Sequence, residues 1–460
     1  MTVAANVAGR LADAIGAKRV VFAAEELATY EIDGLMPSTI VRPCSAEEVA
    51  ETVRFAVAEK LAVLPLGSRS KCDLGMPPTQ YDIALDMTGL RSIAHFDAGD
   101  LTLSVDAGMP LRELEVYLKQ RRQFLPLAVP CFESTTVGGS VASGIDSALR
   151  LQYGSARDFL IGAEFIDGTG QICKSGGRVV KNVTGYDLHK LLIGSLGTLG
   201  AITRLNFRTF PLPAAFGGHV AGFARSETAL AYRRAVEKSG LPLSNLEVLS
   251  SGVVEMIRAI LQRSGENVPT ELEHTDWCVY SSLEGDEEVV RRIGAELERI
   301  GRDTGAVFHR ILGTAEDESL GGMLRECFEW LRWASPANVI CRVVLPEVKS
   351  VLLDGLLRLA ESATLRAALL VRAAGIVYFA VLAEAEDESA MESLQKVVAG
   401  ARTLAEAENG IATLLHAPLG VKQSTARMKT ARMESTLQQR VKQAFDPSNV
   451  FAPGRVVGGI

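Results

Sequence analysis

The sequence has 460 residues, 47% of them hydrophobic and 22% charged, which is the balance of a well-packed globular protein and not of a disordered one. At roughly 100–200 residues per domain, this length predicts two to four domains. The formal net charge of −7 argues against a general nucleic-acid binder, because that role requires a basic surface.

The first part of the chain alternates short apolar runs with stretches of helical periodicity. Ser45-x-x-Glu48 is a capping box, Asp167–Gly170 is a hairpin turn, and Thr135–Gly144 is predicted to be a loop with a short helix start. Helices are predicted near Val7–Ile15, from Ser45 to Lys60, from Pro110 to about Arg121, and at Leu188–Gly194. Strands are predicted at Leu61–Leu66, Ile83–Asp86, Leu101–Ala107, Leu160–Ile166, Gln171–Lys174 and Ala201–Phe210.

The texture changes at Pro211–Gly218, where two prolines and two consecutive glycines predict a domain boundary. Beyond this point the pattern is α+β, which predicts an antiparallel sheet covered by helices. Strands are predicted at Val339–Leu345, Ile376–Leu382 and Ile411–Leu415, and helices at Glu347–Ser362, Ser389–Leu404 and Gln423–Ala444.

Several classes of site are excluded by pattern. The seven cysteines are odd in number and form no C-x-x-C pair, and the six histidines lack metal-ligand spacing, so we expect reduced thiols in a cytoplasmic protein and no metal site. The first ten residues lack the basic start and long apolar run of a signal peptide, and no run of about 18 apolar residues occurs, so we expect neither a signal peptide nor a spanning helix and any membrane contact to go through a partner. The common dinucleotide and P-loop fingerprints are also missing.

Three segments rich in small residues remain. The first is the loop Gly67-Ser-Arg-Ser-Lys71 after a predicted strand, where small side chains let consecutive N–H groups face one anion. The second is Glu133-Ser-Thr-Thr-Val-Gly-Gly-Ser140, with Gly144 beyond it. Each of these two, taken alone, is as consistent with an ordinary tight turn as with a ligand-binding loop. The third, Arg178–Asp187 followed by Gly194-Ser-Leu-Gly-Thr-Leu-Gly200, has more glycine than an ordinary element needs.

These motifs resemble the FAD-binding domain of the vanillyl-alcohol oxidase and para-cresol methylhydroxylase flavoproteins. The closest likeness is within the glycolate oxidase and FAD-linked lactate dehydrogenase branch. Tyr153–Asp158, Phe445-Asp-Pro447 and Pro453-Gly-Arg455 match that branch as well.

The resemblance implies a fold class, α+β, with a two-subdomain FAD-binding domain followed by a cap domain that contains an antiparallel sheet. The implied domains are an N-terminal helical segment (1–34), the FAD-binding domain (35–213), the cap (214–430) and a C-terminal segment that returns to the FAD-binding domain (431–460).

The resemblance also implies positions for the cofactor contacts. The loop Gly67, Ser68, Arg69, Ser70 and Lys71 should face the FAD pyrophosphate. Flavin and phosphates should be lined by Thr135, Thr136, Gly138 and Gly139, with Gly144 packed against the cofactor and Ile202 in backbone contact with it.

The sequence departs from the family at two places. Ser68 and Arg69 replace glycines of the pyrophosphate loop, and Arg69 either pairs with a phosphate or weakens FAD binding. Glu408-Asn409-Gly410 stands where catalytic relatives carry Glu-His-Gly. This second departure points to the smaller, accessory subunit of a glycolate oxidase-type complex, beside a larger catalytic FAD subunit and an iron–sulfur subunit, with membrane association only through those partners.

The implied chemistry is hydride transfer from a small 2-hydroxy acid to flavin, turning glycolate into glyoxylate. Arg342 is the candidate clamp for the substrate carboxylate, since a guanidinium makes two parallel bonds to that group, although an ion pair at a strand edge is the more ordinary role. Two alternatives remain open: a free-standing FAD-dependent 2-hydroxy-acid dehydrogenase, and a degenerate flavin domain kept as a non-catalytic scaffold.

Overall fold

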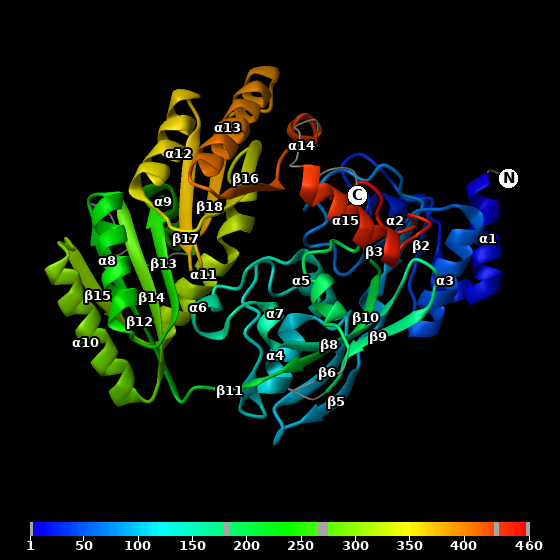
Figure 1. Cartoon of the computed structure of the whole chain (residues 1–460), viewed down its shortest axis with the longest axis horizontal. Helices are drawn as coiled ribbons and strands as arrows, with labels where there is room; N and C mark the ends of the chain where they lie inside the picture. The colour runs from blue at the N-terminus through cyan, green and yellow to red at the C-terminus, as the bar shows by residue number, and fades with distance from the viewer. Residues whose placement is uncertain (1–2, 179–184, 265–274, 427–431, 457–460) are drawn as a thin grey trace. The chain divides into compact units, whose positions relative to one another are not determined.

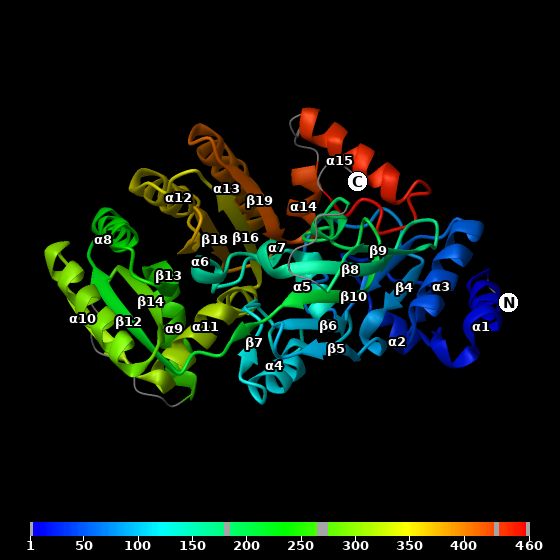
Figure 2. The same cartoon turned by 60° about the horizontal axis from the view of Figure 1, so that its bottom comes forward.

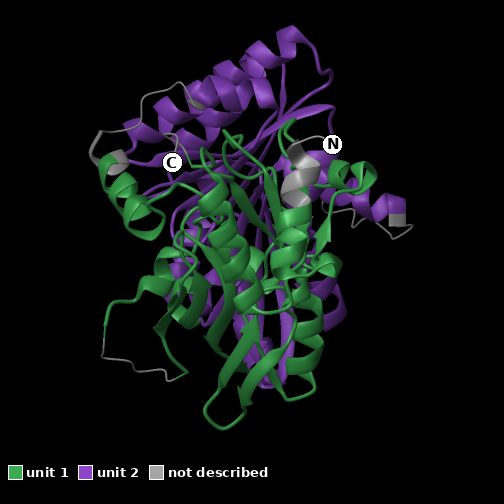
Figure 3. Cartoon of the chain, turned by 90° about the vertical axis from the view of Figure 1, so that its right-hand side faces the viewer, with its two compact units in different colours: residues 1–146, 155–212, 426–460 green, residues 147–154, 213–425 purple. Residues whose placement is uncertain are grey.

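A computed structural model describes residues 3–178, 185–264, 275–426 and 432–456 of the chain (Figure 1). The chain divides into two compact units (Figure 3). Unit 1 contains Met1–Asp146, Ser155–Leu212 and Ala426–Ile460, and unit 2 contains Ser147–Gly154 and Pro213–Thr425. Within the described ranges, none of the helices has the length and apolar character that a bilayer span requires.

The first sheet of unit 1 has the order β1-β2-β4-β3, with β2, β4 and β3 parallel to one another and β1 antiparallel. Apolar side chains cover both of its faces, mainly from helices α1 and α3 on one of them. The strands are β1 (Val20–Val21), β2 (Thr39–Val41), β3 (Val63–Leu66) and β4 (Ile83–Asp86), and the helices are α1 (Val3–Ile15), η1 (Ala17–Arg19), α2 (Ala24–Ala28), α3 (Ala46–Glu59) and η2 (Met87–Gly89).

The capping box predicted at Ser45 starts α3, with one change. The hydroxyl of Ser45 accepts a hydrogen bond from the backbone N–H of Glu48 at 3.2 Å. The Glu48 carboxylate, however, accepts from the N–H of Cys44 at 2.6 Å and not from that of Ser45. The helix therefore begins where the motif places it, and its return bond lies one residue upstream.

The second sheet of unit 1 is antiparallel and has the order β5-β6-β10-β8-β9. The predicted hairpin is confirmed, since β8 and β9 pair directly across Asp167–Gly170. The strand predicted to reach Phe210 is interrupted at Thr209, and a short β11 then pairs with β7. The strands are β5 (Ile93–Asp97), β6 (Thr102–Asp106), β7 (Gln123–Phe124), β8 (Leu160–Ile166), β9 (Ile172–Gly176), β10 (Ala201–Arg208) and β11 (Phe210–Pro211).

Helical segments join and cover this second sheet. One face of β6, β8 and β10 packs on α4 and α5 to form the largest core of unit 1. The segment predicted helical after residue 187 is a 3₁₀ turn, η3. The helices are α4 (Leu111–Lys119), α5 (Val137–Ser143), α7 (Ala156–Phe159) and η3 (Leu188–Leu191), and α6 (Arg150–Tyr153) belongs to unit 2.

The C-terminal segment completes unit 1. One helix was predicted over Gln423–Ala444, whereas the structure has two, with residues 427–431 outside the described ranges. They are α14 (Leu419–Ala426), which belongs to unit 2 up to Thr425, and α15 (Arg432–Phe445), which belongs to unit 1. The chain after α15 runs beside β3, where the N–H of Val63 donates to the carbonyl of Val450 and the N–H of Ala452 donates back to Val63.

Unit 2 is built on an eight-stranded antiparallel sheet of order β15-β12-β14-β13-β17-β18-β16-β19, which agrees with the predicted α+β architecture (Figures 1 and 2). Helices α8, α10, α12 and α13 contact one another in one layer, and α9 packs on α11. The strands are β12 (Ala215–Phe223), β13 (Leu243–Ser250), β14 (Trp277–Gly285), β15 (Phe308–Leu312), β16 (Ala337–Val344), β17 (Arg366–Arg372), β18 (Ile376–Ala383) and β19 (Ile411–His416). The helices are α8 (Ser226–Ser239), α9 (Ser251–Ser264), α10 (Glu287–Asp303), α11 (Thr314–Trp333), α12 (Ser350–Ser362) and α13 (Glu388–Ala407).

The interior of unit 2 contains polar groups that bond to one another. Arg372 of β17 donates to the carboxylate of Glu247 on β13 at 2.6 Å, and both side chains are almost fully buried. Asp317 of α11 accepts from the Tyr280 hydroxyl at 2.7 Å and from Ser282 at 3.3 Å. Burial raises the pKa of Asp317 to about 7.

Candidate functional site

A pocket in unit 1 lies where β3 ends, and it gathers parts of the three small-residue segments. The loop after β3 forms one side, helix α5 another, and the turn before β10 contributes Leu196. The lining residues are Leu64, Pro65, Leu66, Gly67, Ser68, Arg69, Ser70, Lys71, Cys72, Thr136, Gly139, Ala142, Ser143, Leu196 and Arg455.

The loop after β3 leaves its main-chain donors unused. Among the described residues, the backbone N–H groups of Ser68, Arg69 and Ser70 donate to no acceptor of the protein. Arg69 has φ 64°, in the left-handed region that normally favours glycine. The backbone at Arg69 therefore adopts a conformation that glycine usually takes.

The second segment meets this loop directly. Thr136 is the N-cap of α5, and its hydroxyl accepts from the N–H of Gly139 at 3.1 Å. A Cβ added at Gly67 would lie 2.2 Å from that hydroxyl, so only glycine permits this approach. Gly138 instead faces Ala107, the residue after β6, and an added Cβ would lie 2.6 Å from the Cβ of Ala107.

The third segment packs against the other two. Gly144, the left-handed C-cap of α5, approaches Gly194 so closely that an added Cβ would lie 2.6 Å from the Gly194 Cα. Gly197 lies against the ring of Pro65. Ile202 of β10 is buried in the core of the second sheet opposite Phe165, and it is not among the residues that line the pocket.

Two cationic side chains of the loop are held in place. The Lys71 ammonium donates to the hydroxyl of Thr135, which also hydrogen-bonds Ser70 at 3.0 Å. The Arg69 guanidinium stacks on the ring of Tyr30, with its Cζ 4.0 Å from the ring centroid. Positive charge is thus fixed beside the unused N–H donors.

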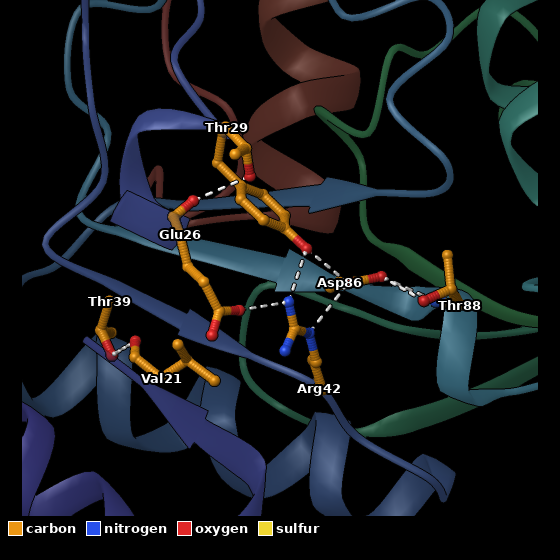
Figure 4. A network of polar contacts seen from close by, with 8 residues as sticks. Val21, Glu26, Thr29, Thr39, Arg42, Asp86 and Thr88 are labelled. Carbon is orange, nitrogen blue, oxygen red and sulfur yellow. Dashed lines mark hydrogen bonds and ion pairs between the residues drawn. The ribbon is translucent and has the colours of Figure 1, made fainter. Parts of the chain in front are cut away.

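A network of polar contacts fixes Tyr30 in turn. Its hydroxyl donates to Asp86 at 2.6 Å, at the end of β4. Arg42 bonds both Asp86 at 3.3 Å and Glu26 at 2.9 Å (Figure 4). Burial, followed by the hydrogen bond to Asp86, raises the pKa of Tyr30, so the phenol stays protonated and remains a donor.

These features fit a ligand that carries a diphosphate. Three adjacent N–H donors and two cations surround a space that small side chains leave open, and such a turn is an anion-binding concavity. A charge-assisted bond from an amide to a phosphate oxygen contributes roughly 1.5–3 kcal/mol. A dinucleotide cofactor such as FAD supplies that group.

Other residues singled out in the sequence lie elsewhere. Arg342 is on β16 of unit 2, between Tyr378 and Thr413 on the neighbouring strands, so its strand is not at the sheet edge. His189 is buried and bonds Ser175 through its ring at 3.1 Å, and burial lowers its pKa. Residues 179–184 of the third motif lie outside the described ranges.

Four further residues line the pocket although the sequence did not predict them as cofactor contacts: Leu196, Ala142, Ser143 and Arg455. Arg455 had a visible signal, because Pro453-Gly454-Arg455 was one of the motifs that carried the resemblance. Leu196 also lies within a singled-out motif, the run Gly194–Gly200, whereas Ala142 and Ser143 are ordinary side chains between Gly139 and Gly144.

Comparison with known protein families shows to which family the chain belongs. The sequence pattern of the family described as "FAD linked oxidases, C-terminal domain" matches residues 213–456, more than half of the chain. The chain belongs to the FAD-linked oxidases. The family described as "FAD binding domain" matches residues 37–176, which include the loop after β3 and helix α5, and FAD is the cofactor that both families indicate.

Curated relatives match parts of the chain. The glycolate oxidase subunit GlcE of Escherichia coli is 37% identical over 38% of this chain and 50% of its own length. The D-2-hydroxyglutarate dehydrogenase of Xanthomonas citri pv. viticola is 33% identical over 38% of each chain. The mitochondrial D-2-hydroxyglutarate dehydrogenase of Bos taurus is 30% identical over 65% of this chain and 55% of its own length. The chain thus spans about half or less of these relatives.

Solved structures of the same fold cover nearly the whole chain. p-Cresol methylhydroxylase superposes with a TM-score of 0.79 over 98% of this chain and 96% of its own, at 17% identity. The 4-ethylphenol oxidase of Gulosibacter chungangensis gives 0.75 over 98% and 97%, at 14% identity. The fold is therefore that of the p-cresol methylhydroxylase type, with its FAD-binding domain and antiparallel C-terminal domain.

Proposed function

We propose that the chain is the FAD-binding subunit of a glycolate oxidase-type complex that oxidises a small 2-hydroxy acid. The observation that carries the proposal is the loop after β3, whose N–H groups at Ser68, Arg69 and Ser70 have no acceptor among the described residues. The relatives named as glycolate oxidase subunits and 2-hydroxy-acid dehydrogenases support the substrate class.

The residues of the pocket have separable tasks in this proposal. Gly67–Lys71 and Gly139 bind the FAD diphosphate, while Thr136 holds the N-terminus of α5 against that loop. Bound flavin supplies a hydride acceptor for the α-carbon of the hydroxy acid. Arg342 is proposed to orient the substrate carboxylate through two parallel hydrogen bonds.

The accessory role is supported at the end of α13. The segment Glu408-Asn409-Gly410 stands where catalytic relatives are expected to have Glu-His-Gly. Here Glu408 is the C-cap residue of the helix, and its carboxylate pairs with Lys349 at 2.7 Å. We propose that the larger catalytic flavoprotein and the iron–sulfur subunit complete the reaction, with the complex cytoplasmic and any membrane contact made by those partners.

The first experiment separates the alternatives with the purified chain. An absorption spectrum is recorded before and after anaerobic addition of glycolate and of D-lactate, and turnover is then assayed with an artificial electron acceptor. We expect stoichiometric FAD, no turnover by the chain alone, and turnover when the larger flavoprotein and the iron–sulfur subunit are added. Robust turnover by the chain alone would instead make it a free-standing dehydrogenase, and a colourless chain that takes up no FAD would favour a scaffold.

Two variants test the assigned residues. Gly139→Leu places a bulky side chain against Thr136, so we expect loss of FAD retention. Arg342→Met should raise the KM for the hydroxy acid in the assembled complex and leave the FAD content unchanged. Arg358→Met, at an exposed position on α12, is the matched control. FAD bound by the Gly139 variant with unchanged affinity would refute the placement of the loop.

A further inference from the structure

The main-chain N–H groups of the loop that is proposed to bind the diphosphate do not fix its backbone. Its N–H groups at Ser68, Arg69 and Ser70 make no hydrogen bonds to described residues, and Arg69 is in a left-handed conformation. Side-chain contacts hold the loop to Thr135 and Tyr30, and its backbone conformation also depends on what fixes the chain on either side. On the N-terminal side that is β3, which is paired in the sheet.

On the C-terminal side the loop continues into residues 72–76, and a distant arginine binds them. Arg455 is buried, and its guanidinium donates to the carbonyl of Cys72 at 2.6 Å, to that of Met76 at 3.2 Å, and to that of Leu74. The carbonyl of Arg455 accepts from the N–H of Met76 at 2.9 Å. One residue near the end of the chain thus bonds four backbone groups of the segment that follows the loop.

A second buried cation, Lys442, joins the same C-terminal segment to the third small-residue segment. The Lys442 ammonium donates to the carbonyl of Thr198 at 2.8 Å, to that of Phe451 at 2.7 Å, and to the carboxylate of Asp446 at 2.6 Å. Asp446 in turn accepts from the N–H groups of Val450 and Phe451. Residues 442–455 therefore connect the turn at 194–200 to the segment after the loop through hydrogen bonds of Lys442 and Arg455.

We propose that Arg455 and Lys442 are positioning residues which hold the diphosphate loop and the turn at 194–200 in the conformation that binds FAD. The loop is then ordered before FAD binds, so the free energy of binding does not include the entropic cost of ordering it. This inference rests on the proposed FAD site and adds to it a dependence on the C-terminal segment.

The test is titration of FAD, and separately of ADP, into the deflavinated full-length chain. ADP carries the diphosphate without the isoalloxazine ring, so it probes the loop alone. Arg455→Met should raise both dissociation constants by at least about ten-fold. Arg440→Met, at an exposed position on α15 in the same segment, is the matched control and should bind both ligands as the wild type does.

Further readouts separate positioning from general destabilisation. Saturating FAD should return the Arg455→Met variant to the wild-type flavin spectrum, and Arg455→Lys should recover part of the affinity because it keeps a donor to one carbonyl. Gly75→Ala disturbs the same contact from the segment after the loop, since its Cβ would lie 2.6 Å from the carbonyl oxygen of Arg455. It should also raise the dissociation constant for FAD. If Arg455→Met does not fold, the FAD affinities of Arg455→Lys and Gly75→Ala test the proposal instead.

The inference is overturned if Arg455→Met binds FAD and ADP with wild-type affinity, or if Arg440→Met weakens both to the same extent. Wild-type affinity in both Arg455→Lys and Gly75→Ala would have the same meaning. Failure of the wild-type chain itself to bind FAD would be a different result, because it would refute the proposed function.

Discussion

The two units use buried charge in different ways. In unit 2, Arg372 pairs with Glu247, and Asp317 accepts from Tyr280, so side chains satisfy one another. In unit 1, Lys442 and Arg455 donate mainly to backbone carbonyls of loops. The first arrangement closes an interior, whereas the second fixes loops around a pocket.

The difference shows what a binding site requires of a fold. A binding site needs polar groups that make no hydrogen bonds within the protein. Other groups, which do make such bonds, must hold them in position. In unit 1 the N–H groups of Ser68–Ser70 have no acceptor among the described residues, and the C-terminal segment 442–455 fixes the backbone beside them. Changes in unit 2 should therefore alter folding stability, and changes around the pocket should alter affinity.

Separate probes make this comparison measurable. All three tryptophans, at 277, 330 and 333, belong to unit 2, so tryptophan fluorescence follows the unfolding of that unit. Flavin fluorescence follows the FAD bound by unit 1. Changes in the interior of unit 2 should move the tryptophan signal more, and changes that separate the segments around the pocket should move the flavin signal more.

The largest effect is expected from Glu247→Leu. It leaves the guanidinium of Arg372 buried without its carboxylate, which should lower the free energy of unfolding by about 3–5 kcal/mol. Urea unfolding followed by tryptophan fluorescence measures this, and the dissociation constant for FAD should stay the same. Glu296→Leu breaks an exposed pair with Arg299 and should change stability by less than about 1 kcal/mol. Equal losses in the two variants would contradict this interpretation.

The next effect is a pH dependence of unit 2. Because burial raises the pKa of Asp317 to about 7, the folded state holds this proton more tightly than the unfolded state does. The contribution to stability is present below pH ~4, falls as pH rises from about 4 to about 7, and is then lost, by at most about 4 kcal/mol at ~1.4 kcal/mol per unit.

Asp317→Asn isolates this contribution. The wild type also contains His219, whose pKa is lowered to about 4 by burial and by His309, and which makes stability rise between pH 4 and 6.5. Subtracting the unfolding free energies of the two proteins at each pH removes the histidine contribution. A difference that does not change between pH 5 and 8 would show that Asp317 does not titrate there.

A smaller effect, on affinity, is expected from Gly67→Ala. Its Cβ would lie 2.2 Å from the Thr136 hydroxyl, so the loop and α5 must separate. FAD should bind at least about ten-fold more weakly, equivalent to ~1.4 kcal/mol, while tryptophan-detected unfolding is unchanged. Gly177→Ala, where an added Cβ meets nothing within 4 Å, is the control. Unchanged FAD affinity would mean that the two segments do not need to meet.

The smallest effect is expected at Arg69. Replacement by glycine relieves the left-handed strain, about 1 kcal/mol, and loses the stacking on Tyr30, about 0.5–1 kcal/mol. These nearly cancel, so thermal stability should change little. Arg69→Met keeps the strain and loses the stacking, and it should be less stable by about 0.5–1 kcal/mol. A glycine variant that is less stable than the methionine variant would contradict this account.

Local patterns predicted much of the molecule. The hairpin at Asp167–Gly170, the helix after Ser45 and the strands at Ile83–Asp86 and Leu160–Ile166 match the structure closely. The strand predicted through Phe210 was interrupted because β11 turns to pair with β7, which is a non-local event. The helices and strands between residues 218 and 338 were not assigned at all.

The sequence by itself was enough to predict the family and the cofactor through the resemblance of its motifs to known flavoproteins, and many helices and strands through the apolar period, which is a local property of the chain. Only the tertiary structure decided that the hydroxyl of Thr136 lies against Gly67 and that Arg455 binds Met76, 379 positions away. Contacts of that separation follow from how the sheets and the tail pack, and a linear pattern carries no record of them.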